Sequence, residues 1–287
     1  MSKNKHISVL LMGGLGNQIF QFCIAKNFEE KGYKVTIDTS NFDKFKNAKT
    51  FPFLHREQIF PIEFFGFQET KRSIKLTYNF FEKLKKYHLF PKYLSFTKEI
   101  NDYNYRDYKF SKINKAIGYW QDTELIKNYK NYIKESISNN EELSKSLRRE
   151  AQPGSTVLHI RRGDYLNMDE ALSESFYKEA IKFCQKNIKN FKFQIFTDDY
   201  EWAKDKKLFK GAEKIHSDEI SISNTIDTFS KMLSNENFII GNSTFSLIAA
   251  LLVGKKNSKI IVADPWFRNK DRNLNFDKSW VHINNSK

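Results

Sequence analysis

Hydrophobic and polar positions in the first part of the chain predict a strand, a turn, a helix and a second strand. Residues 6–12 form a continuous apolar run, which is typical of a strand buried on both faces. A glycine-rich turn follows at 13–16, and residues 17–31 carry apolar side chains at helical spacing until Gly32 ends the helix. Residues 33–38 form the second predicted strand. This βαβ order predicts a parallel sheet.

Strands and helices alternate again in the second half of the chain, so we expect a second parallel sheet. The predicted strands are 156–160, 191–196, 238–240 and 259–263, and the predicted helices are 173–189, 225–234 and 245–253. A break containing Pro153 and Gly154 precedes this half. We therefore predict an N-terminal domain at 1–150 and a C-terminal domain at 151–287.

The stretch between these two patterns is less periodic. Residues 41–117 are rich in Phe, Tyr and Lys, and we expect an insertion of helices and loops there. Residues 125–150 show a charged, helical pattern. No window approaches the roughly 20 apolar residues that a membrane-spanning helix needs, and the first apolar run is too short for a signal peptide. The sequence predicts a folded, cytoplasmic protein.

The formal net charge of +14 favours anionic partners such as phosphates, nucleic acid or an acidic membrane surface. The charge does not choose among them, and abundant lysine throughout the chain also fits a compositional bias. No zinc-finger spacing or RNA-recognition motif accompanies it, so a basic nucleic-acid-binding protein is only the distant alternative. Cys23 and Cys184 lie in apolar helical patterns, which predicts buried thiols in a reducing compartment.

The first candidate binding motif is the turn at residues 13–18, Gly-Gly-Leu-Gly-Asn-Gln. Glycines before a helix let a ligand approach the backbone, and the helix N-terminus favours an anion. Asp38, at the end of the second strand, resembles the acidic residue of a dinucleotide fold. The third glycine of G-x-G-x-x-G is missing, however, because Ile19 stands there. A tight turn that only packs the helix on the strand fits the motif equally well.

The second motif places two adjacent arginines after a strand. Residues 159–165 have the sequence His-Ile-Arg-Arg-Gly-Asp-Tyr, so Arg161 and Arg162 lie at the carboxyl end of the strand. That edge of an open α/β sheet binds ligands, and the planar arginine fork suits phosphate oxygens. Asp164 is close enough to hold an arginine in place or to act as a base. The alternatives are an Arg–Asp surface pair and, for His159, a hydrogen-bonded strand residue.

Hydroxyl side chains open the helix that follows the strand at 238–240. Residues 242–246 have the sequence Asn-Ser-Thr-Phe-Ser, and such hydroxyls cap a helix or bind phosphate at its start. Asp227 lies upstream, where we expect a helix cap or first-turn acid, or an acceptor for a base edge in a nucleotide site. Residues 196–199, Phe-Thr-Asp-Asp, fit an aspartate cap better than a metal site.

Three segments together resemble the signature blocks of glycosyltransferase family 11, the α-1,2-fucosyltransferases; they are 13–21, 159–165 and 242–246. The segment at 196–199 is similar to a weaker block. The resemblance implies an α/β, GT-B-like fold of two facing Rossmann-type domains with parallel sheets, the N-terminal one mainly on the acceptor side. Leu247 and Ile248 stand where family members often have two tryptophans, which changes the packing behind the site.

The resemblance also implies a bacterial enzyme that transfers L-fucose from GDP-fucose to the 2-hydroxyl of a terminal galactoside, with inversion and without a metal or other cofactor. The donor-binding residues that it implies are His159, Arg161, Arg162, Asp227, Ser243, Thr244, Phe245, Gly14, Gly16 and Asn17. Arg161 and Asp164 are the catalytic candidates. Arg161 would stabilise the leaving diphosphate, and Asp164 would remove the acceptor proton or only orient Arg162. Another GDP-sugar or linkage in surface polysaccharide synthesis is the alternative.

A basic stretch at 71–93 carries six lysines and one arginine interleaved with aromatic residues. This pattern predicts contact with anionic lipid, or with a lipid-linked acceptor, at the inner face of the plasma membrane. A solvated face of a helical insertion is the alternative.

Overall fold

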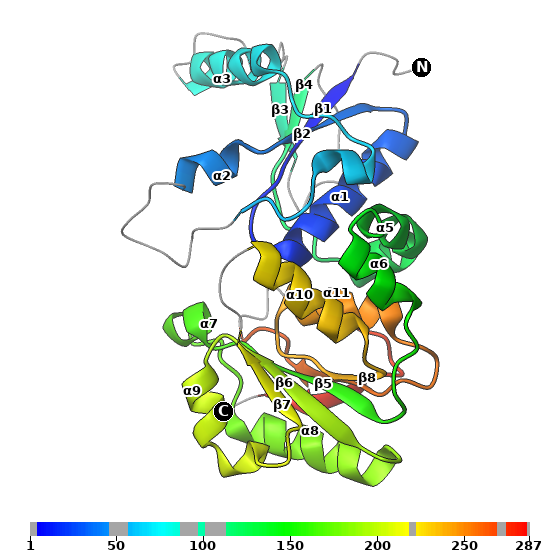
Figure 1. The fold of residues 1–287 in the computed structure, drawn as a ribbon. Coiled ribbons are helices and arrows are strands. Elements are labelled where there is room, and N and C mark those ends of the chain that lie inside the picture. The colour runs from blue at the N-terminus through cyan, green and yellow to red at the C-terminus, as the bar shows by residue number, and fades with distance from the viewer. Residues whose placement is uncertain are drawn as a thin grey trace. The chain divides into compact units, whose positions relative to one another are not determined.

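The structure, a computed structural model, describes residues 5–45, 57–86, 97–100, 113–217, 222–268 and 274–285 (Figure 1). The chain divides into two compact units, Met1–Gln121 and Asp122–Lys287. This division lies earlier than the boundary that we expected after residue 150. Three helices that precede that boundary contact α10 (Ile222–Leu233) and α11 (Thr244–Val253) of the second unit; they are α4 (Thr123–Asn128), α5 (Lys130–Ile137) and α6 (Glu141–Arg148).

The N-terminal unit is built on a four-stranded parallel sheet of order β2-β1-β4-β3. The strands are β1 (His6–Leu10), β2 (Lys34–Asp38), β3 (Thr97–Ile100) and β4 (Ile113–Ala116), and the helical elements are α1 (Leu15–Glu30), α2 (Ser40–Phe45), η2 (Ile62–Phe65) and α3 (Arg72–Lys86). The predicted βαβ unit is confirmed as β1-α1-β2. We did not predict β3 and β4, because runs of four residues are too short to show a period.

The two faces of this sheet differ in polarity. Alternate strand residues point to opposite faces, and Ile7, Val9 and Ile37 form an apolar face that is fully buried. Helix α1 contacts β1 and β2 and contributes its own buried apolar side chains. The other face carries polar residues, and Lys75 of α3 reaches the Asp38 carboxylate there. A polar sheet face under a helix is unusual for a parallel sheet.

The C-terminal unit contains a six-stranded sheet of order β10-β9-β8-β5-β6-β7, and all neighbouring strands pair in parallel. The strands are β5 (Ser155–Ile160), β6 (Lys192–Thr197), β7 (Lys214–Ser217), β8 (Asn237–Ile239), β9 (Ile260–Asp264) and β10 (Val281–Asn284). The four strands predicted in this half are confirmed. The predicted α/β class with two parallel sheets is therefore confirmed as well.

Four further helical elements belong to this unit; they are α7 (Gly163–Asn167), α8 (Glu174–Asn187), α9 (Tyr200–Asp205) and η4 (Lys207–Phe209). Helix α8 packs on the sheet through Phe176 and Tyr177, which are fully buried in the core cluster. Cys23 and Cys184 are buried free thiols, as predicted. Among the described residues, no helix is both long and apolar enough to cross a membrane.

Two helix predictions differ from the structure. The charged, helical pattern at 125–150 corresponds to three helices, α4, α5 and α6, and the Asn140 side chain accepts a hydrogen bond from the Leu143 amide at 3.1 Å and so caps α6. Helix α10 already includes Ile222, so Asp227 lies in its middle. The prediction that Asp227 is a helix cap or a first-turn acid is wrong, because the apolar spacing of this helix starts earlier than we assigned.

Candidate functional site

The carboxyl edge of the C-terminal sheet brings together three of the candidate segments. Strands β5, β6 and β8 are neighbours and run in parallel, so the residues that follow them meet at one edge. Arg161 follows β5, Asp198 follows β6, and Ser243 lies between β8 and α11. The sheet order therefore produces the cluster that the spacing of the motifs suggested.

The Arg161 guanidinium is held by two carboxylates. Its Nη2 lies 2.7 Å from Asp164 Oδ1 and its Nη1 lies 2.8 Å from Asp198 Oδ2. Burial alone would lower the pKa of Arg161, but these two carboxylates raise it overall. The side chain is 20% exposed, so it is a fixed cation with part of its fork open to a ligand.

Asp198 also organises the backbone after β5. Its carboxylate accepts hydrogen bonds from the Arg162 amide at 2.8 Å and the Gly163 amide at 3.2 Å. A Cβ on Gly163 would lie only 2.8 Å from Asp198 Oδ2, so the close approach requires glycine. Asp198 was not among the predicted site residues. Its place directly after a strand was the available signal.

Arg162 takes a different direction from Arg161. Its Nε donates to Asp199 Oδ2 at 3.0 Å, and its guanidinium lies 3.9 Å from the centre of the Trp202 ring. Asp199 also caps α9, as predicted, because its side chain accepts from the Trp202 amide at 3.2 Å. The prediction that Asp164 orients Arg162 is wrong: Asp164 pairs with Arg161, and Asp199 takes Arg162.

His159 is a buried, neutral residue that links β5 to α11. Its Nδ1 lies 2.8 Å from Ser246 Oγ, and its ring lies 6.1 Å from the Phe245 ring. Burial, followed by the charge of Arg161, lowers the pKa of His159 to about 3. The histidine therefore carries no charge near neutral pH and stays hydrogen-bonded behind Arg161.

The start of α11 is fixed by a side-chain cap and by its neighbours. Ser243 Oγ accepts from the Phe245 amide at 3.4 Å, which confirms the capping role. Thr244 is the first residue of the helix and, like Ser243, is partly exposed. The Tyr165 hydroxyl donates to the Asn242 carbonyl at 2.9 Å and ties α7 to this start. The helix N-terminus thus lies in a braced segment at the same sheet edge, which suits an anion.

Asp227 projects from α10. Its carboxylate pairs with Lys231 one turn later, and its side chain is 45% exposed. Phe229 of the same helix packs on Phe245 with 5.4 Å between the ring centres, so α10 borders the start of α11. The Asp227 carboxylate does not cap the helix, because it lies in the middle of α10, and it is accessible to a ligand.

The glycine-rich turn at 13–18 lies in the N-terminal unit. Gly13 has φ +76°, and a Cβ on it would lie 2.7 Å from Asn17 Nδ2, so glycine is required on both counts. Gly14 caps α1 without a side chain and has open space beside it, and Gly16 is buried inside α1. Asn17 Oδ1 accepts from Gln121 Nε2 at 2.9 Å.

Two glutamines of the same motif brace this turn. Gln18 donates to the Gly13 carbonyl at 2.9 Å and accepts from the Ile59 amide at 2.9 Å. Gln21 accepts from the Met12 amide at 3.0 Å and donates to the Gly118 carbonyl at 2.9 Å. Both side chains are fully buried. They hold the backbone and are not available to a ligand.

The fold and this phosphate-suited edge are those of a glycosyltransferase with a sugar-nucleotide donor. The chain belongs to glycosyl transferase family 11, whose family model matches residues 6–284. The resemblance seen in the sequence is thereby confirmed. The family implies a nucleotide-sugar donor and a glycan acceptor.

The chain is also similar to individual proteins. The chain is 29% identical to an alpha-1,2-colitosyltransferase of Escherichia coli, with 95% of this chain and 97% of that protein covered. It is 26% identical to the O-antigen biosynthesis glycosyltransferase WbnK of Escherichia coli over 58% of this chain and 59% of that protein. The fucosyltransferase NodZ from Bradyrhizobium is a similar solved structure, with a TM-score of 0.45, 11% identity, and 88% of this chain and 93% of that chain covered.

Proposed function

We propose that this chain transfers L-fucose from GDP-fucose to the 2-hydroxyl of a terminal galactoside, with inversion and formation of an α-1,2 linkage. The observation that carries the proposal is Arg161, a fixed and partly open cation at the sheet edge beside the start of α11. Membership of family 11 and the α-1,2 linkage in the name of the relative support it.

The proposed reaction is one displacement at the anomeric carbon. The acceptor oxygen forms a bond to that carbon while the bond to the diphosphate oxygen breaks, and GDP leaves with the electron pair. Arg161 and the amides at the start of α11 stabilise the charge that develops on the diphosphate. The acceptor proton passes to the Asp164 carboxylate. In this proposal Arg161 replaces a metal ion, so turnover should persist in excess chelator.

Donor binding and the base are coupled in this scheme. In the structure, Asp164 occupies Nη2 of Arg161 at 2.7 Å. A diphosphate oxygen that takes this nitrogen displaces Asp164 from the guanidinium, while Asp198 holds the other side at 2.8 Å. The released carboxylate is then available for the acceptor proton. The base is thus freed only when the donor is bound.

The remaining predicted donor contacts complete the proposal. Ser243, Thr244 and Phe245 surround the phosphates and the nucleoside, His159 supports Arg161 from behind, and the Asp227 carboxylate accepts from the guanine N1 and N2 hydrogens. Arg162 stays a prediction as a donor ligand, and so do Gly14, Gly16 and Asn17 of the N-terminal unit.

A second candidate donor is favoured by one relative. Because that relative is an alpha-1,2-colitosyltransferase, GDP-colitose is the alternative to GDP-fucose. Colitose lacks the 3-hydroxyl of fucose, so one hydrogen bond to that hydroxyl would decide between them. A site that pairs with the 3-hydroxyl should reject the deoxy sugar strongly, because its own polar group is left unpaired.

Turnover with GDP-fucose, GDP-colitose and GDP-mannose against a panel of galactosides tests the function. We expect transfer from one of the first two donors and an α-1,2 linkage in the product by NMR. Arg161→Ala should abolish transfer while its circular dichroism spectrum stays native. Absence of binding by GDP and GDP-fucose in calorimetry, or near-normal turnover of Arg161→Ala, would overturn the proposal.

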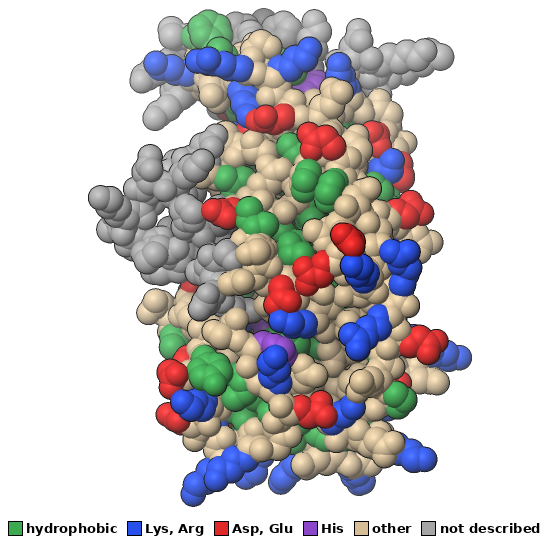
Figure 2. Space-filling model, viewed as in Figure 1, with side chains coloured by type: hydrophobic (Ala, Val, Ile, Leu, Met, Phe, Trp, Pro, Cys, Tyr) green, Lys and Arg blue, Asp and Glu red, His purple; other side chains and the backbone are tan. Residues whose placement is uncertain are grey.

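We also propose that the outer face of α3 contacts anionic lipid and that the acceptor is lipid-linked. Leu76 and Phe80 are 58% and 59% exposed on this helix, and Arg72 and Lys83 are exposed beside them. Figure 2 shows basic side chains around apolar ones at the top of the view, where α3 lies. Exposed apolar residues flanked by cations suit an acidic interface. Part of the stretch at 71–93 lies outside the described residues.

Liposome flotation tests this surface. Leu76→Ser/Phe80→Ser should lose binding to phosphatidylglycerol vesicles, and neutral phosphatidylcholine vesicles should not retain the wild type. Equal retention of the double variant and the wild type would refute the lipid contact.

A further inference from the structure

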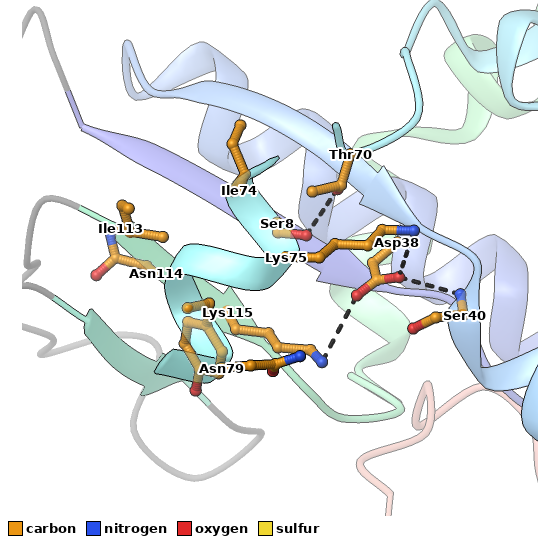
Figure 3. A pocket seen from close by; sticks show the side chains of 11 residues that line it. Ser8, Asp38, Ser40, Thr70, Ile74, Lys75, Asn79, Ile113, Asn114 and Lys115 are labelled. Carbon is orange, nitrogen blue, oxygen red and sulfur yellow. Dashed lines mark hydrogen bonds and ion pairs between the residues drawn. The ribbon is translucent and has the colours of Figure 1, made fainter. Parts of the chain in front are cut away.

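A partly open cavity of about 120 Å³ lies between α3 and the polar face of the N-terminal sheet (Figure 3). Its polar lining comes from β1, β2, β4, α3 and the segments beside them; the polar residues are Ser8, Asp38, Ser40, Thr70, Lys75, Asn79, Asn114 and Lys115. Four of them, Ser8, Asp38, Thr70 and Asn114, are almost completely buried, and Asn79 is exposed. Burying polar groups costs free energy unless they are paired, so we looked for the role of this polar lining.

The charged groups of the cavity balance one another. Lys75 lies 3.1 Å from one oxygen of Asp38 and Lys115 lies 3.5 Å from the other, and Figure 3 shows them reaching that carboxylate from two elements. Glu69, outside the lining, pairs with Lys75 at 3.1 Å. Burial would raise the pKa of Asp38, but hydrogen bonds from Ser40 and Lys75 and the charge of Lys115 lower it overall. Two cations and two carboxylates leave no net charge for an anion.

The neutral polar groups offer both donors and acceptors. Ser8 Oγ lies 2.7 Å from Thr70 Oγ1, which lies 2.8 Å from Thr36 Oγ1, and Thr36 in turn lies 2.9 Å from His6 Nε2. Each hydroxyl in this row of hydrogen bonds can donate in either direction, so Ser8 presents a donor or an acceptor to the cavity. Asn79 adds an amide, which has both functions.

Apolar surface completes the lining. Ile74 and Tyr78 of α3 and Ile113 of β4 border the cavity. A carboxylate, amides, hydroxyls and an aromatic ring together suit a sugar, whose hydroxyls both donate and accept and whose C–H face is apolar. Inorganic phosphate or a diphosphate is disfavoured, because both lysines of the lining are already paired with the Asp38 carboxylate.

The position and the size of the cavity agree with such a ligand. Asp38 is the last residue of β2, and its carbonyl accepts from the Leu11 amide at 2.9 Å, just before the glycine-rich turn. The cavity reaches that end of β2, and it extends over the sheet face to Ile113 and Asn114 at the start of β4. Its volume equals that of about four water molecules, which admits part of one sugar ring through the open side.

We propose that this cavity is a subsite for one uncharged pyranose unit of the acceptor glycan. The assignment of this sugar to the acceptor glycan rests on the proposed function. The sugar binding itself is independent of the reaction, because every lining residue belongs to the N-terminal unit.

Titration of the ¹⁵N-labelled full chain with methyl β-galactopyranoside, without a donor, tests the site. The side-chain amide resonances of Asn79 and Asn114 should shift on binding. Asn79→Ala and Ser8→Ala each remove one hydrogen-bonding group and should weaken binding about fivefold. Ser73→Ala is the matched control, because Ser73 is an exposed residue of α3 outside the cavity. Thermal unfolding of each variant checks the fold.

Kinetics then separate this proposal from the proposed function. In a working transfer assay, Asn79→Ala should raise the acceptor KM about fivefold and leave kcat and donor hydrolysis unchanged. Absence of amide shifts with the galactoside, or shifts that Asn79→Ala and Ser8→Ala leave intact, overturns the subsite whatever the transfer assay gives. Inorganic phosphate that shifts the same amides also overturns it. Galactoside binding without any transfer supports the sugar site and refutes the proposed reaction alone.

Discussion

Replacing Asp164 by asparagine should have opposite effects on donor binding and on turnover. The carboxylate lies 2.7 Å from Arg161 Nη2, so it competes with a diphosphate for the guanidinium. It is also the proposed acceptor of the proton. Asparagine has nearly the same shape but neither the charge nor the basicity. GDP binding should therefore become tighter while turnover falls.

The size of the binding effect follows from Coulomb's law. A diphosphate oxygen on Arg161 lies roughly 5 Å from the Asp164 carboxylate, where two like charges repel by roughly 3 kcal/mol at ε of 20 and roughly 1 kcal/mol in bulk water. The side chain is 24% exposed, which calls for an intermediate value of about 1.5 kcal/mol. GDP should bind Asp164→Asn about tenfold more tightly.

Calorimetry with GDP and steady-state turnover measure the two effects. We expect kcat to fall by about 10²–10³ if Asp164 accepts the proton. Asp199→Asn is the matched control, because it makes the same chemical change beside Arg162 and asparagine still caps a helix. It should change the Kd for GDP less than about twofold. Weaker GDP binding by Asp164→Asn would refute the competition, and unchanged kcat would exclude Asp164 as the base.

Three further predictions concern neighbouring residues. Arg161→Lys keeps the charge but loses the planar fork that binds Asp198 on one side and the phosphate on the other, so GDP affinity should fall about tenfold or more in calorimetry; an unchanged Kd would contradict the need for the fork. Asp227→Asn should remove the preference for GDP over inosine diphosphate, which lacks the N2 amino group; a retained preference would exclude a guanine contact. Because the folded pKa of His159 is about 3 and the unfolded value is about 6.5, protonation favours unfolding as the pH falls between these values. When the pH falls from 6.5 to 5, the wild type should therefore lose roughly 1.5 kcal/mol more stability than His159→Gln in urea unfolding. An equal loss in both proteins would refute the neutral, buried state of His159.

Much of the C-terminal site was predictable from local patterns. An apolar strand followed by Arg161 predicts a cation at the carboxyl edge of the sheet, and the Ser243 cap follows from a hydroxyl before an apolar helix. The partners of the arginines were not predictable in this way. Asp198 is 37 residues from Arg161 in the chain and reaches it only because β6 lies next to β5. Spacing shows which residues end strands, but strand order decides which ends meet.

The polar cavity escaped prediction for a related reason. Polar and apolar residues alternate in β1 and β2, but we interpreted the strand that contains Ser8 as a continuous apolar run and so did not predict a polar face. Only the pairing of β1 with β2 and β4 places Ser8, Thr36 and Lys115 on one face. Lys75 then reaches that face from a helix that sequence analysis interpreted only as a basic surface. The same helix therefore has an inner face directed at the cavity and an exposed outer face.

The two adjacent arginines, Arg161 and Arg162, have different partners and different roles. Arg162 pairs with Asp199 and lies 3.9 Å from the centre of the Trp202 ring, so it joins the end of β5 to α9. Arg161 forms ion pairs with both Asp198 and Asp164. Asp198 serves both, because it binds the Arg161 guanidinium and the amide of Arg162. A ligand that displaces Asp164 would leave Arg161 fixed by Asp198, with its direction unchanged. The geometry thus favours a site in which the cation is rigid and the neighbouring carboxylate is the part that changes partners.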